Sequence, residues 1–170
     1  MTQPARLVPA LIMAIGLGAI AAALVAQYVF NLQPCILCYY QRVPYVAALL
    51  LGAHALPPWT PANRRVLCVA LAGLAFLANG GIALFHVGVE NHWWAGTDSC
   101  GSPIAATTIE DLRRQLMAAP VVRCDEVTWS LFGISMAGYN ALAAPFLAAF
   151  AFWGARAIAK TQTGSSSVSQ

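Results

Sequence analysis

Apolar residues fill four long runs of this chain, and polar residues gather between them. An α-helix rises about 1.5 Å per residue, so about 20 apolar residues are enough to cross a bilayer. The pattern therefore predicts an all-α integral membrane protein, a bundle of four transmembrane helices that forms one domain over residues 1–160. Its spans would cover residues 7–30, 39–56, 66–89 and 136–159.

A secretory signal peptide is an alternative interpretation of the first run, because small residues at 21–26 resemble a cleavage site. The apolar region of a signal peptide is only about 7–15 residues long. Since the run at 7–30 is longer, we favour a helix that is retained.

Polar segments predict two loops on one side of the membrane, a short one at 31–38 and a long one at 90–135. Within the long loop, residues 107–117 repeat apolar side chains on one helical face. This pattern predicts a short surface helix, which would lie on the membrane or pack on the loop. The Ser-rich tail at 161–170 is typical of a disordered segment.

Charged residues are few and unevenly placed. The chain is 59% hydrophobic and 9% charged, whereas a soluble domain carries about 25% charged residues. All acids lie in the long loop, while the opposite ends of the runs carry only cations, namely Arg6, Arg64, Arg65, Arg156 and Lys160. The positive-inside rule therefore places both termini in the cytoplasm and both loops outside, which for a bacterial chain means the periplasm. A net charge of +3 without a basic stripe argues against nucleic acid as a partner.

Two of the five cysteines form a C-x-x-C motif at the start of the second run. Cys35, Cys38 and Arg42 would share one face of a helix that begins near Cys35. A helix N-terminus and a nearby cation both favour thiolate over thiol. Only about 14 residues of this run, 43–56, are apolar without interruption, which is short for a span. We therefore predict a redox-active dithiol at the membrane interface.

Two other interpretations of the motif remain open. A structural Cys35–Cys38 disulfide would close a very small ring and gain little loop entropy. A zinc site built from Cys35, Cys38, Cys100 and Cys124 would have four ligands. The outward compartment, however, favours oxidation over metal thiolates.

Cys100 and Cys124 lie in the long loop and would form a second pair. A bracing disulfide there would add about 3 kcal/mol of stability in the loop-entropy model. Because the flanking segments are polar, we expect both sulfurs to be accessible to another protein. Two accessible pairs on one side suggest an electron relay. Cys68 lies inside an apolar run, and we expect it to be a packed residue.

Two polar side chains near the dithiol are candidates for binding a membrane electron acceptor. Arg42 could donate hydrogen bonds to a carbonyl oxygen of a quinone, or it could only extend to the lipid headgroups. His86 lies near the outer end of the third run, and we expect it to be a packed residue.

The stretch Gln33-Pro34-Cys35-Ile36-Leu37-Cys38-Tyr39-Tyr40-Gln41-Arg42, together with the four runs and the second cysteine pair, resembles the DsbB family of membrane proteins that generate disulfides. The resemblance extends to about Lys160 and is weak between Cys100 and Cys124. Near the last span it rests on Trp129, Phe132, Gly133 and Met136.

The resemblance implies a function for the four cysteines. A reduced DsbA-like protein with a thioredoxin fold would attack a Cys100–Cys124 disulfide at Cys100. Electrons would then pass to the Cys35–Cys38 disulfide, and Cys38, near Arg42, would reduce ubiquinone or menaquinone. This matches the pathway known to keep the bacterial periplasm oxidising, so the resemblance also implies a bacterial inner-membrane location.

Two alternatives to this function remain. The chain could be a paralogue of the family that serves one dedicated partner. It could also be a structural or assembly subunit in which two disulfides only brace the outer loops.

Overall fold

Four long helices form the protein. The computed structural model describes residues 3–97, 100, 108–110, 113 and 122–166, so most of the surface helix predicted at 107–117 lies outside the described residues. Each long helix is apolar enough to cross a membrane, which confirms the predicted four-helix membrane bundle. The helices are α1 (Gln3–Tyr28), α2 (Ile36–Ala55), α3 (Ala62–Glu90) and α5 (Met136–Ser166).

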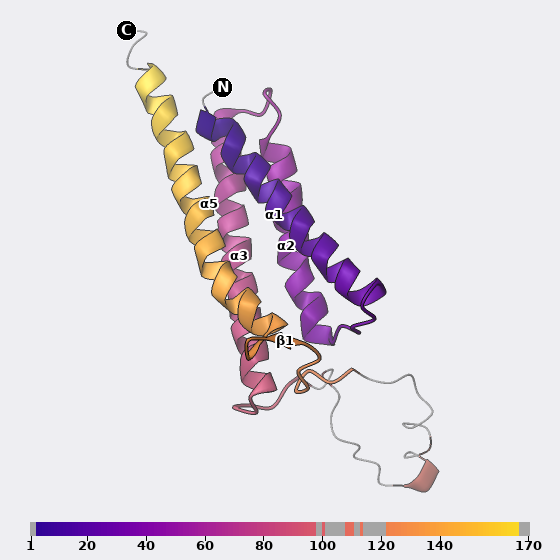
Figure 1. Ribbon diagram of the computed structural model, residues 1–170. Coiled ribbons are helices and arrows are strands. Elements are labelled where there is room, and N and C mark those ends of the chain that lie inside the picture. Colours follow the sequence, from indigo (N-terminus) through magenta and orange to yellow (C-terminus); the bar gives the residue numbers. More distant parts are fainter. Residues whose placement is uncertain (1–2, 98–99, 101–107, 111–112, 114–121, 167–170) are drawn as a thin grey trace.

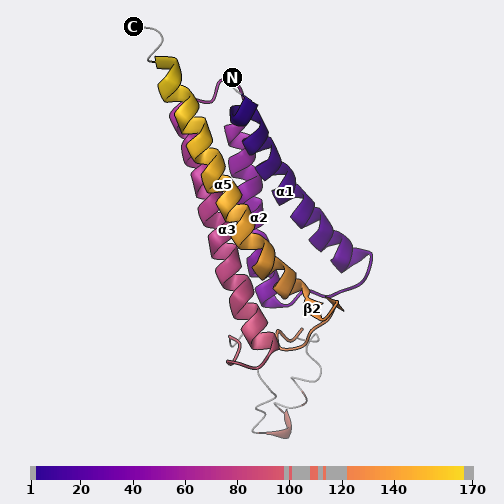
Figure 2. The same ribbon diagram turned by 60° about the vertical axis from the view of Figure 1, so that its left-hand side comes forward.

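The helices pack in a simple order (Figure 1). α5 lies along α3, α2 packs against α3, and α1 packs against α2. Toward its C-terminal end α1 diverges from α5 in both views (Figure 2). The N- and C-termini lie at one end of the bundle, and the start of α2 and of α5 lie at the other.

Glycine lets α1 and α2 approach closely. A Cβ atom added to Gly16 would lie 2.7 Å from the carbonyl oxygen of Tyr45, and one added to Gly52 would lie 2.7 Å from the amide nitrogen of Met13. Both distances are too short for a real Cβ contact, so this helix pair depends on glycine at both positions. The largest buried side chains of the adjoining core are Ile12, Phe76 and Ile158.

Large apolar side chains cover the outside of the bundle. In water such a surface would cause aggregation, whereas in a bilayer it contacts lipid chains at no cost. This surface is the one expected of a multi-pass membrane protein. It includes Leu17, Leu50, Leu74, Leu84, Phe146 and Trp153.

A short β-hairpin leads into α5. Its strands β1 (Ser130–Leu131) and β2 (Ile134–Ser135) pair in antiparallel fashion. Phe132 and Gly133 form the turn with φ values of 50° and 78°, the left-handed conformation of the commonest two-residue hairpin turn. The apolar pattern did not predict these strands, because two residues are too few to show a period of two.

The last helix is longer than its apolar run. α5 ends at Ser166, beyond residue 161, where the sequence analysis places the start of a disordered tail. Once a helix is formed, each added residue also adds a hydrogen bond, so polar residues can extend it. Residues 167–170 lie outside the described part of the chain.

Candidate functional site

Cys35 and Cys38 lie where α2 begins. Cys35 is the N-cap of the helix, and its sulfur accepts a hydrogen bond from the Cys38 amide at 3.4 Å. The two Sγ atoms lie 3.1 Å apart, and both cysteines are free thiols. The structure therefore shows the reduced form of the pair, on a helix that begins where the motif predicted.

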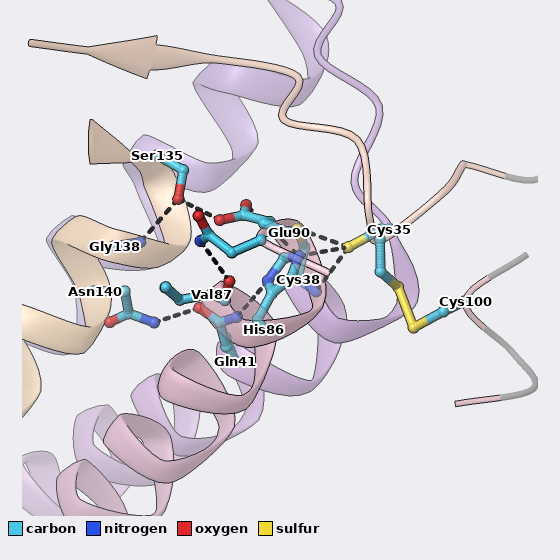
Figure 3. Close-up of polar contacts among 12 residues, drawn as sticks. Cys35, Cys38, Gln41, His86, Val87, Glu90, Cys100, Ser135, Gly138 and Asn140 are labelled. Atoms are coloured by element: carbon cyan, nitrogen blue, oxygen red, sulfur yellow. Dashed lines mark hydrogen bonds and ion pairs between the residues drawn. A yellow bond between two sulfur atoms is a disulfide. The ribbon is translucent and has the colours of Figure 1, made fainter. Parts of the chain in front are cut away.

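His86 reaches the pair from α3. Its Nε2 atom lies 3.5 Å from Cys35 Sγ, and its Nδ1 atom lies 2.9 Å from Gln41 Nε2. Nε2 is also 3.9 Å from a carboxylate oxygen of Glu90. The residue is only 4% exposed, and Figure 3 shows its ring between Gln41 and the two cysteines. His86 is packed, as expected, but against a reactive sulfur rather than only apolar neighbours.

These contacts favour the thiolate form of Cys35. A hydrogen bond from Cys38 is the largest influence, and with the smaller contribution of His86 it lowers the pKa of the Cys35 thiol to about 4, although burial acts in the opposite direction. An unperturbed cysteine has a pKa of about 8.5. In the reduced pair, these contacts therefore lower the Cys35 pKa below that of an ordinary cysteine.

Arg42 lies one helical turn beyond Cys38. Its Nη1 atom donates a hydrogen bond to Gln27 Oε1 at 2.8 Å, and its guanidinium carbon lies 4.8 Å from the centre of the Tyr39 ring. These contacts hold the cation between α1 and α2. A guanidinium has five N–H donors, so Arg42 retains donors for a ligand oxygen.

A cavity of about 380 Å³ adjoins the dithiol and Arg42. This volume is at the lower end of the range for small-molecule sites, about 300–1,000 Å³. Its lining combines alanines of α1 with polar side chains of α2, α3 and α5. A lining of this kind can hold an apolar ring that carries hydrogen-bonding oxygen atoms. The lining includes Ala19, Ala22, Ala23, Ala26, Cys35, Cys38, Gln41, Arg42, His86 and Asn140.

Hydrogen bonds continue from His86 into the bundle. Gln41 Oε1 accepts from Asn140 Nδ2 at 2.5 Å. Asn140 Oδ1 in turn accepts from Asn79 Nδ2 at 2.8 Å and from the Tyr45 hydroxyl at 2.7 Å. This network joins α2, α3 and α5 at the level of the cavity. The sequence analysis did not single out its amides, although a polar residue inside an apolar span is itself a signal of function.

Cys100 and Cys124 form a disulfide with their Cα atoms 5.1 Å apart. Cys100 is 6% exposed and Cys124 is 0% exposed, so the expectation of accessible sulfurs is wrong for this structure. The reason is that both pack with Cys35, Leu37 and Val89 in one buried cluster. Figure 3 shows the disulfide beside Cys35. The two cysteine pairs are therefore neighbours.

Cys68 lies apart from the other four cysteines. It is buried in the main bundle core, with Val69 and Ala72 as members of the same cluster. This cluster does not include the residues around the two pairs. Cys68 is a packed residue, as the sequence analysis predicts.

Charged side chains surround the chain segment that follows Cys124. Arg123 forms an ion pair with Asp125 through two nitrogen atoms, and it lies 3.2 Å from Glu126. The hydrogen bonds from Arg123 lower the pKa of the Asp125 carboxyl. Both Arg123 and Glu126 also line the cavity, so its edge carries charges of both signs.

Comparison with known proteins identifies one family. The family model described as "Disulfide bond formation protein DsbB" matches residues 5–154. A "Disulfide bond formation protein B 2" of Pseudomonas syringae is 32% identical, covering 73% of each chain. The "Disulfide bond formation protein B" of Xanthomonas euvesicatoria is 34% identical over 70% of this chain and 72% of its own. That of Saccharophagus degradans is 30% identical over 80% of this chain and 84% of its own. No solved structure matches.

Proposed function

The chain belongs to the DsbB family of disulfide bond formation proteins, and on that premise we propose that it is a quinone-dependent protein thiol oxidase. Its substrate would be a reduced DsbA-like protein with a thioredoxin fold. Electrons would leave through ubiquinone or menaquinone. The family membership itself makes the chain a membrane disulfide oxidoreductase, and the partner and the acceptor are the proposal.

One observation supports the relay most strongly, namely the position of Cys35. Cys35 belongs to the same buried cluster as Cys100 and Cys124, and it also lines the cavity with Cys38 and Arg42. Thiol–disulfide exchange requires direct contact between sulfur atoms. In this proposal, Cys35 would exchange with the outer pair on one side and face the acceptor on the other.

The outer pair would accept electrons first. A partner thiolate attacks Cys100 Sγ, the Cys100–Cys124 bond breaks, and Cys124 leaves as a thiolate. The second partner thiol then displaces Cys100, so the partner departs with a new disulfide. Two electrons now reside on Cys100 and Cys124 as thiols. Because both sulfurs are buried, the partner must open this cluster when it binds.

The inner pair would pass the electrons on. A thiolate of the outer pair attacks the Cys35–Cys38 disulfide at Cys35, which frees Cys38 and re-forms the Cys100–Cys124 bond in two exchange steps. A quinone, when bound, would supply an acceptor for two electrons and two protons, so that Cys35 and Cys38 could return to the disulfide.

Three side chains would assist at the cavity. Arg42 would donate hydrogen bonds to an acceptor oxygen. Asn140 donates a hydrogen bond to the side-chain oxygen of Gln41. The Gln41 amide nitrogen therefore faces His86 Nδ1. This arrangement keeps the His86 proton on Nε2, which can then donate a hydrogen bond to the Cys35 thiolate 3.5 Å away.

We also propose the orientation of the bundle. Cations without acids flank the end that carries the termini, and the positive-inside rule assigns that end to the cytoplasm. Both cysteine pairs would then face the periplasm of a bacterium with this protein in its inner membrane. That compartment allows disulfides to persist.

The Cys38→Ser variant tests the function. In membranes supplied with quinone, this variant should fail to oxidise a reduced thioredoxin-fold partner. Without Cys38 there is no inner disulfide to accept electrons from the outer pair. The Cys68→Ser variant is the matched control and should oxidise the partner at the normal rate. If Cys38→Ser oxidises the partner as fast as the unmodified chain, the oxidase proposal fails and a bracing role for the disulfides is favoured.

A further inference from the structure

Three potential metal ligands converge at the start of α2. The sulfurs of Cys35 and Cys38 and a ring nitrogen of His86 all lie within 4.8 Å of one another. Cys35 and His86 are buried, and Cys38 is half-buried. The zinc site considered from the sequence needed Cys100 and Cys124, which the structure joins in a disulfide. The structure replaces those two donors with His86.

The spacing of these atoms is close to that of a tetrahedral zinc site. With Zn–S near 2.3 Å and Zn–N near 2.0 Å, tetrahedral angles place two sulfurs about 3.8 Å apart and a sulfur about 3.6 Å from a nitrogen. The Cys35 Sγ–His86 Nε2 distance is 3.5 Å, the two sulfurs are 3.1 Å apart, and Cys38 Sγ lies within 4.8 Å of a His86 ring nitrogen. The sulfurs would have to separate by about 0.7 Å, a shift that side-chain rotation can supply.

We propose that the reduced Cys35–Cys38 pair and His86 bind one Zn²⁺ ion, and that the bound ion holds the pair in its reduced form. Each thiol that is protonated before binding releases its proton, and no electron is transferred. The oxidised pair has no thiolate and does not bind the ion. Zinc would therefore inhibit the protein by capturing the state that must be reoxidised. This inference requires only the reduced pair and not the proposed acceptor.

The fourth coordination position has two candidate donors. The Glu90 carboxylate lies 3.9 Å from His86 Nε2. The adjoining cavity, which Glu90 also lines, has room for a water molecule. A Cys₂His set with one further position is an established zinc arrangement.

The hydrogen-bond network must rearrange when the ion binds. A metal on His86 Nε2 leaves the ring proton on Nδ1, which then needs an acceptor. Gln41 at present turns its nitrogen toward Nδ1 and its oxygen toward Asn140. Both amides must therefore rotate to present the Gln41 oxygen. A carboxylate at position 41 would accept the Nδ1 proton without this rotation, so Gln41→Glu should strengthen binding.

Cobalt titration tests the site directly, because Co²⁺ replaces zinc and its thiolate bonds absorb light. The full chain carrying Cys100→Ser and Cys124→Ser is reduced with a phosphine, freed of metal and titrated in detergent without quinone. We expect one Co²⁺ per chain with a thiolate charge-transfer band, displaced by Zn²⁺. The same chain with the Cys35–Cys38 pair oxidised should show no band.

Further variants separate this site from adventitious binding. His86→Gln should weaken Co²⁺ binding at least tenfold, Gln41→Glu should strengthen it, and Cys68→Ser should leave it unchanged. The proposal is overturned if the reduced chain gives no charge-transfer band. It is also overturned if His86→Gln binds as tightly as the parent, or if the oxidised chain binds equally well. Since no quinone is present, failure here does not bear on the oxidase function.

Discussion

Cys35 owes part of its lowered pKa to His86, a neighbour far away in the sequence. Cys38 and the helix N-terminus follow from the C-x-x-C spacing alone, but His86 is contributed by another helix. A sequence shows which residues share a helix face, whereas the rotation of one helix against another depends on packing along their whole length. For this reason the motif and Arg42 could be singled out in advance, and the contact between His86 and Cys35 could not.

The thiolate at Cys35 gives a pH prediction. Its pKa is lowered to about 4, so the thiolate should persist below neutral pH and be lost only as the pH falls toward that value. In the reduced chain with Cys100→Ser and Cys124→Ser, alkylation of Cys35 should therefore remain fast in mildly acidic buffer. Mass spectrometry of the alkylated peptide measures this rate against pH.

Two variants check the cause of the lowered pKa. Cys38→Ala should move the alkylation profile of Cys35 toward higher pH, because it removes the hydrogen bond from the Cys38 side chain, which is the largest influence. His86→Gln should move it in the same direction by less. A profile centred near pH 8.5, the pKa of an ordinary cysteine, would contradict the described contacts.

Arg42 should affect acceptor binding. A hydrogen bond from a charged group contributes about 1.5–3 kcal/mol, and each 1.4 kcal/mol is a factor of about ten. Arg42→Met should therefore raise the apparent KM for quinone about tenfold or more. Arg42→Lys keeps the charge but loses the planar donor set, so its effect should be intermediate. Quinone-dependent rates at a saturating concentration of the partner measure the KM of both variants. An unchanged KM in Arg42→Met would show that Arg42 does not contribute to quinone binding.

The helices themselves were the most predictable elements. A run of apolar residues long enough to span a bilayer predicts a helix, because the backbone must satisfy its own hydrogen bonds in lipid. The close approach of α1 and α2 could not be predicted from the sequence. Gly16 and Gly18 look alike in the sequence, but only Gly16 faces a neighbouring backbone.

This difference between two glycines of α1 leads to a prediction about the stability of their alanine variants. Gly16→Ala places a methyl group 2.7 Å from the Tyr45 carbonyl oxygen, and overpacking of this kind costs about 1–3 kcal/mol. Gly18→Ala meets nothing within 4 Å and should be neutral or stabilising, by up to about 1 kcal/mol, through helix propensity. Thermal unfolding in detergent compares the two variants. Equal shifts in Tm would contradict the described α1–α2 contact.

The whole molecule places two cysteine pairs and a cavity at one end of a membrane bundle. The number of spans and the position of the first pair at the start of the second helix followed from the sequence. The cavity did not, because it arises where α1 diverges from α5. The burial of the Cys100–Cys124 disulfide was also missed, since polar flanking residues do not reveal that Val89 and Leu37 cover the sulfurs.

The central claim is that electrons from a thiol partner leave through quinone. The most direct measurement is the amount of quinol formed per partner disulfide by the purified chain without oxygen. We expect one quinol for each disulfide, and neither product from Cys38→Ser. Formation of the partner disulfide without quinol, or at the same rate when quinone is omitted, would contradict this account.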